Sequence, residues 1–117
     1  MYQYKAHVVR VVDGDTVDLA VDLGFNIIQT GKYRLYGPDP RKPWGMDAPE
    51  LSTPEGQAAK AYLQTILQVG FEVMVETIKD RKEKFGRWLA VVHLCDGTGR
   101  NANDEMVKAG HAVLKAY

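Results

Sequence analysis

The chain has 117 residues, of which 45% are hydrophobic and 26% charged, as in one ordinary globular domain. Fifteen basic residues balance fifteen acidic residues, which argues against a protein that binds nucleic acid through excess positive charge. One cysteine excludes an internal disulfide bond, and no apolar run approaches the ~20 residues that a membrane span needs.

The N-terminal segment MYQYKAHVVR lacks the basic and then apolar order of a signal peptide. We therefore expect a cytoplasmic protein as the sequence is written, or a secreted one if a leader has been removed. No association with a membrane is expected.

The first third of the chain has the alternating pattern of β-strands. Residues 8–12 are mostly β-branched, and residues 15–23 place apolar side chains at every second position. The dipeptide Asp13-Gly14 between these runs predicts a hairpin turn. A third strand is predicted over about residues 32–36.

Prolines mark the middle of the chain. Three of them fall within about residues 37–45, which predicts an insert loop without regular structure. Ser52 or Thr53 can cap a helix that Pro54 opens, because proline suits the first helical position. An apolar stripe then continues to about residue 66.

The last part of the chain predicts two more strands and a second helix. The strands cover residues 71–78 and 87–94, and Asn103 is the expected N-cap of a helix over residues 104–109. Three strands, a helix, two strands and a helix can form a small closed barrel with a helix across one end. We therefore predict one domain over residues 1–117, mainly β (α+β), with an OB-type five-stranded antiparallel barrel and two to three short helices.

Asp15 is the first residue that points to chemistry. Its register places it on the same strand face as the apolar side chains that follow it. A carboxylate on an inward face is costly unless a cation or several hydrogen-bond donors meet it. The alternative is an ordinary turn residue in the sequence DGDT, where Asp and Gly are common.

Asp47 and Glu50 form a second acidic element, and Pro49 stiffens the segment between them. One carboxylate can bind a hard cation through oxygen, as Ca²⁺ and Mg²⁺ prefer, while the other acts on a water molecule. The alternative is that Glu50 only favours the positive end of the helix that follows.

Arg34 and Arg87 lie within apolar strand sequences. Arginine in such a place is either a surface residue or forks around an oxyanion. Because Arg34 alternates with Lys32, the surface alternative stays open. Carboxylates, a hard cation and guanidinium groups together are what hydrolysis of a phosphoryl ester needs.

The segments VVDGDTVDL, YRLYG…MDAPE and EKFGRWLA resemble, in this order, three signature segments of the staphylococcal nuclease (thermonuclease-like) family, and NANDEMVKAGHA resembles its second helix. The resemblance covers nearly the whole chain. It implies an OB-type five-stranded barrel that cleaves DNA and RNA with Ca²⁺. It also implies that Asp15 and Asp47 bind the metal with the backbone carbonyl of Ala48, and that Glu50 is the general base or positions the attacking water.

The same resemblance assigns the residues that contact substrate. Arg34 and Arg87 would stabilise the scissile phosphate. Lys84 and Phe85 would lie at the terminal phosphate, although Phe85 stands where the family often has tyrosine. Tyr117 would stack on a base, or would simply be a frayed terminal residue.

Because of the insert, Asp39 and Asp47 are both candidates for the second metal-binding aspartate. The family normally has four residues between its first arginine and this aspartate, and Asp39 keeps that distance from Arg34. Only Asp47 is followed by the Ala-Pro-Glu segment that supplies Glu50, so we choose Asp47. The partial echo between RLYGPDP and RKPWGMDAP leaves Arg41 as an alternative to Arg34.

The sequence therefore predicts a monomeric, calcium-dependent, sugar-nonspecific endonuclease with DNA and RNA as substrates. It does not say which of the two is the biological substrate. The alternative is a non-catalytic OB-type module that binds nucleic acid or protein. A histidine-based mechanism is disfavoured because His7, His93 and His111 match no zinc spacing.

Overall fold

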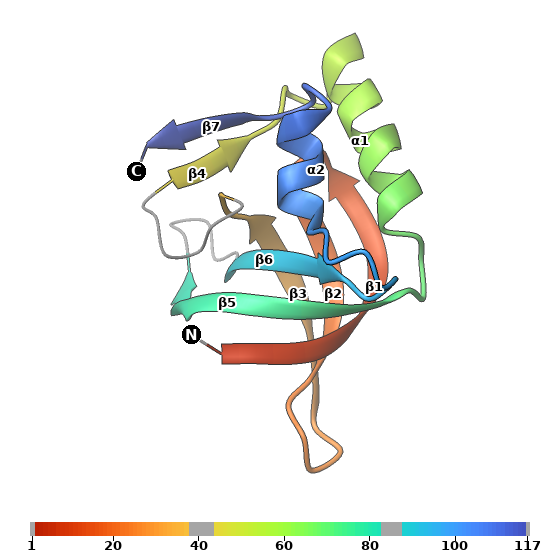
Figure 1. Cartoon of the computed structure of the whole chain (residues 1–117), viewed down its shortest axis with the longest axis vertical. Coiled ribbons are helices and arrows are strands. Elements are labelled where there is room, and N and C mark those ends of the chain that lie inside the picture. The colour runs from red at the N-terminus through yellow and green to blue at the C-terminus, as the bar shows by residue number, and fades with distance from the viewer. Residues whose placement is uncertain (1, 38–43, 83–87, 117) are drawn as a thin grey trace.

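Within residues 2–37, 44–82 and 88–116, which the computed structural model describes, five strands close into a barrel in the order β1–β2–β3–β6–β5 (Figure 1). The barrel strands are β1 (Tyr2–Asp13), β2 (Thr16–Asp22), β3 (Ile28–Leu35), β5 (Glu72–Lys82) and β6 (Trp88–Leu94). Four further elements are α1 (Pro54–Ile66), α2 (Ala102–Lys108), β4 (Trp44–Asp47) and β7 (Val113–Ala116). Figure 1 shows these four at one end of the barrel, while the β2–β3 hairpin projects from the other.

Alternation along the strands builds the barrel core. On β2, Val17, Leu19 and Val21 are at most 2% exposed, whereas Asp22 faces solvent. The predicted α+β fold with an OB-type five-stranded barrel is confirmed. Over the described residues, four of the five pairings are antiparallel and the fifth, β3 with β6, is parallel. An odd number of strands cannot alternate all the way around a closed ring, so one parallel pairing is required.

The short β4–β7 ribbon was not predicted. β4 begins at Trp44, within the expected insert loop, and pairs with β7 so that Met46 lies opposite Leu114. Met46 is fully buried. A four-residue strand carries little pattern of its own, and its partner here lies more than sixty residues away along the chain. Most of the expected insert, residues 38–43, lies outside the described residues.

The predicted first helix is confirmed, including its cap. The Thr53 hydroxyl oxygen accepts a hydrogen bond from the backbone N–H of Gly56, and Pro54 opens α1. Gly56, Ala59 and Leu63 make its buried face. No helix in the described part of the chain is long and apolar enough to cross a membrane.

The predicted cap of the second helix is wrong. Asn101, not Asn103, is the N-cap of α2, and its side-chain oxygen accepts from the backbone N–H of Asp104 at 2.6 Å. Two asparagines stand two residues apart, and either can cap a helix. The pattern did not show that one of them turns into the core.

Asn103 is fully buried and ties α2 to the place where β3 and β6 meet. Its side-chain oxygen accepts from the Val92 N–H at 3.0 Å. Its amide nitrogen donates to the carbonyl oxygens of Tyr36 at 2.7 Å and Ala90 at 3.0 Å. Buried polar groups are stabilising only when satisfied, and this side chain satisfies backbone groups from both strand regions.

We expect Asn103→Leu to lower the free energy of unfolding by about 2–4 kcal/mol, because it leaves buried backbone groups without partners. Urea unfolding measures the loss. Asn101→Ala is the matched control and removes only a cap, at a cost of about 1 kcal/mol. Equal losses in the two variants would contradict the role given to Asn103.

Candidate active site

Asp15 lies in the turn between β1 and β2 and is 8% exposed. Its backbone N–H donates to the side chain of Asp13 at 3.0 Å, and its carbonyl oxygen accepts from the Leu35 N–H at 2.8 Å. The second bond joins the turn to the end of β3. Both backbone polar groups of Asp15 are therefore hydrogen-bonded, independently of the contacts of its carboxylate.

The Asp15 carboxylate is met by donors, as its predicted inward position requires. Oδ1 accepts from the Thr16 hydroxyl at 3.0 Å, and Oδ2 accepts from the Ala48 N–H at 3.1 Å. The nitrogen Nη2 of Arg34 lies 3.7 Å from Oδ2. Burial raises the pKa of Asp15 to about 6, and the hydrogen bond and charge of Asp13 act in the same direction. The Ala48 N–H and the Arg34 charge lower this pKa.

Arg34 brings the two predicted aspartates together. Its Nη2 forms an ion pair with Asp47 Oδ1 and donates to the Met46 carbonyl oxygen at 3.0 Å. The same nitrogen is the one that faces Asp15. The Arg34 side chain is only 16% exposed, so the surface alternative for this arginine is wrong. Carboxylates from the β1–β2 turn and from the end of β4 thus converge on one cationic atom.

Glu50 is exposed, but its backbone is fixed at the start of α1. Its carbonyl oxygen accepts from both the backbone N–H and the hydroxyl of Thr53, at 3.0 and 2.7 Å. A Cβ atom at Gly56 would come within 1.8 Å of that oxygen, so only glycine fits there. The helix start therefore fixes the backbone of Glu50 while its side chain is exposed to solvent.

Gly14 is the residue that sequence reasoning missed. A Cβ atom there would lie 2.7 Å from the Ala48 Cβ and 2.8 Å from the Ala59 Cβ. The turn that carries Asp15 therefore touches both the segment after β4 and the buried face of α1. The sequence indicates only a turn at Gly14, because the packing of a distant helix against a glycine leaves no mark in the local sequence.

A pocket of about 260 Å³ adjoins Asp47. Its walls come from Asp47 to Pro49 on one side and from Gly110 to Val113, after α2, on the other. The pocket therefore gives solvent access beside Asp47.

Several predicted residues fall outside the described part of the chain. They are Arg87, Lys84, Phe85 and Tyr117, together with the alternatives Asp39 and Arg41. Their expected roles stay predictions.

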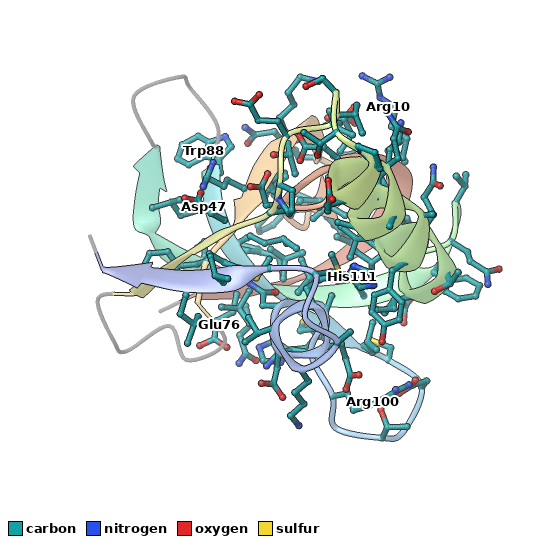
Figure 2. All side chains as sticks on the ribbon, turned by 90° about the horizontal axis from the view of Figure 1, so that it is seen from above. Arg10, Asp47, Glu76, Trp88, Arg100 and His111 are labelled. Atoms are coloured by element: carbon teal, nitrogen blue, oxygen red, sulfur yellow. The ribbon has the colours of Figure 1, made fainter. Side chains whose placement is uncertain are left out.

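The histidines are dispersed. His93 Nε2 lies 2.8 Å from Glu76 Oε1, between β6 and β5, and the His111 ring packs against Tyr62 of α1 with centroids 4.9 Å apart. Figure 2 places His111 beside α1 and Glu76 well away from it. Among the described residues there is no group of three or more His, Cys, Asp or Glu side chains arranged to hold a metal ion.

Comparisons with known proteins agree with the geometry. A family model described as "Staphylococcal nuclease homologue" matches residues 43–117. The protein named Endonuclease YhcR, from Bacillus subtilis (strain 168), is 34% identical over 113 residues, which is 94% of this chain. The chain spans only 9% of the length of that relative.

We expect Gly14→Ala to destabilise the protein by about 1–3 kcal/mol, because the new methyl group overlaps Ala48 and Ala59. Chemical denaturation measures the change. Gly31→Ala is the matched control, since a Cβ at Gly31 meets no atom within 4 Å. An equal loss at Gly31 would show that the close approach at Gly14 is not the cause.

The raised pKa of Asp15 predicts a pH-dependent stability. The folded protein holds this proton more tightly than the unfolded chain, whose carboxyl has a pKa of 3.8. The contribution of Asp15 to the free energy of unfolding is therefore fully present at low pH. It falls by up to about 3 kcal/mol as the pH rises from 4 through 6. Unfolding in chelator at pH 4.5 and 7.5 measures it, and Asp15→Asn should remove this component. Wild type and variant with the same pH dependence would refute the assignment.

Proposed function

The chain belongs to the family of staphylococcal nuclease homologues, and on that basis we propose that it is a calcium-dependent, sugar-nonspecific endonuclease acting on DNA and RNA. The single observation that carries the proposal is the convergence of Asp15 and Asp47 on Arg34. These three side chains come from separate segments, and each is one that phosphodiester hydrolysis uses.

The proposed metal ligands are oxygen atoms, which hard divalent cations prefer. The side chains of Asp13, Asp15 and Asp47 are all carboxylates, and one guanidinium faces the latter two. Burial is the main cause of the raised pKa of Asp15, and the nearby charge of Asp13 adds to it. Asp15, Asp47 and the Ala48 carbonyl would hold Ca²⁺ through oxygen. When bound, such an ion polarises the phosphoryl group.

Glu50 accepts the proton of the attacking water, or orients that water in line with the phosphorus atom. Its exposed side chain reaches solvent, while Thr53 and Gly56 fix its backbone. A fixed backbone restricts the positions that the carboxylate can take, which lowers the entropy lost on reaching the transition state. The bond cut is the 5′ P–O bond, so the products carry a 3′-phosphate and a 5′-hydroxyl.

Arg34 stabilises the charge that develops on the phosphoryl oxygens. In the structure without substrate its guanidinium pairs with Asp47, and it must exchange part of this pairing for phosphate oxygens. Bidentate geometry makes guanidinium well suited to that exchange. Arg87 is the second phosphate-binding arginine of the proposal.

The competing function is a module that binds without catalysis. The observation in its favour is that same Arg34–Asp47 pair, because a guanidinium engaged by a carboxylate has fewer donors left for a phosphate. Binding without cleavage would follow if the pair persists when nucleic acid arrives.

We expect Glu50→Gln to lower kcat on a plasmid or an RNA oligonucleotide by about 10²–10⁴-fold at millimolar Ca²⁺, with little change in KM. A chelator should stop cleavage by the wild type. Glu55→Gln, at an exposed glutamate in the first turn of α1, is the matched control and should cut normally.

Cleavage that survives chelation, or a Glu50→Gln variant that cuts as fast as the Glu55→Gln control, contradicts the proposed mechanism. Oligonucleotide binding without any cleavage by the wild type favours the non-catalytic module instead.

A further inference from the structure

A second pocket, of about 300 Å³, is lined by residues from all five barrel strands. None of the carboxylates described above lines it. Three aromatic side chains line it, namely Tyr4 of β1, Tyr33 of β3 and Trp88 of β6. Its volume is at the lower limit for small-molecule sites, which suits one ring system rather than a whole nucleotide. We refer to it as the aromatic pocket.

The aromatic pocket is joined to the candidate active site through the backbone. Tyr33 directly precedes Arg34 on β3, and Trp88 directly follows Arg87 in the sequence. Tyr33 and Trp88 are also register partners where β3 meets β6. Figure 2 shows Trp88 and Asp47 on the same side of the molecule in the view onto the helical end. Each predicted phosphate-binding arginine is thus a chain neighbour of an aromatic wall.

The pocket also contains an unmet polar group. The Thr77 hydroxyl is buried, the residue being only 6% exposed, and it has no hydrogen-bond partner in the described part of the chain. Buried hydroxyl groups are nearly always satisfied, so an orphan in a cavity wall indicates a ligand or bound water. The exposed amide of Gln29 adds a donor and an acceptor to the same wall.

Flat aromatic walls with hydrogen-bonding groups of both kinds match a nucleobase. A base stacks on aromatic rings through its π-face and offers donors and acceptors at its edge. A methylated lysine or arginine is a poorer fit, because no described side chain that lines the pocket is acidic. A purely apolar ligand would leave the Thr77 hydroxyl unsatisfied.

We propose that the aromatic pocket binds one nucleobase of the polynucleotide, at a nucleotide other than the one whose phosphate lies at Arg34. Side chains of consecutive strand residues point to opposite faces, so Tyr33 and Arg34 serve different nucleotides. The Thr77 hydroxyl and the Gln29 amide contact the base edge. This inference rests on the proposed function, because it takes nucleic acid as the ligand.

Tryptophan fluorescence tests the proposal without catalysis. In a Trp44→Phe background, Trp88 is the only tryptophan, since the chain has two. We titrate a thymidine oligonucleotide in chelator and compare it with an oligonucleotide of equal length that carries abasic sites. The base-bearing strand should quench Trp88 saturably, and the abasic strand should bind at least about fivefold more weakly, as expected for loss of one base–aromatic stack.

Variants at the pocket wall supply the second arm. Tyr4→Leu should weaken the base-bearing strand at least about fivefold, whereas Tyr4→Phe keeps the ring and should bind normally. Phe71→Leu is the matched control, because Phe71 is a partly exposed aromatic outside this pocket. Thermal unfolding confirms that each variant is folded, and Gln29→Ala, at an exposed position, should give a smaller loss if Tyr4→Leu fails to fold.

The outcomes separate the two proposals. Equal binding of the base-bearing and abasic strands, or stronger quenching by a trimethyl-lysine peptide, overturns the base site even if the protein cleaves DNA. Base-dependent quenching in a protein that cuts nothing supports the base site and removes the proposed endonuclease function.

Discussion

The buried carboxylate of Asp15 is the constraint around which the candidate active site is arranged. A charged oxygen in this position is tolerated only because a hydroxyl, a backbone N–H and a guanidinium face it. Those three donors come from β2, from the segment after β4 and from β3. Meeting the needs of one carboxylate therefore fixes the relative positions of three parts of the chain. Burial nevertheless raises the pKa of this carboxyl to about 6, because these donors offset only part of the cost of removing it from water.

Two glycines determine how closely these parts approach. Gly14 allows the β1–β2 turn to touch Ala48 and α1, and Gly56 allows α1 to touch the backbone of Glu50. Helix α1 therefore sets the distance between the β1–β2 turn and the segment that carries Glu50, although it supplies no reacting group. A side chain larger than hydrogen would not fit at either contact, so the geometry of the site depends on glycine at both positions.

Sequence patterns predicted what is local and missed what depends on distant partners. Alternation on β2 gave the barrel core, and Thr53 with Pro54 gave the start of α1. The grouping of Asp15 with Asp47 followed from a family resemblance, and the family is confirmed. The β4–β7 ribbon could not be predicted, since neither strand is long enough to show a period. The inward turn of Asn103 was likewise hidden, because its three hydrogen bonds join segments far apart in sequence.

The parallel pairing that an odd-numbered barrel requires is also its shortest in the described residues, running from Tyr33 to Leu35, while β2 pairs with β3 along its whole length. The pairing of β3 with β6, which we call the seam, therefore has the fewest backbone contacts to keep the barrel closed. Asn103 reinforces this seam, because its amide nitrogen donates to Tyr36, next to β3, and to Ala90 of β6. Arg34, Tyr33 and Trp88 all lie along this seam. Separation of β3 from β6 would therefore disturb the proposed phosphate site and the proposed base site together. The docking of α2 at this seam therefore supports both of the proposed sites.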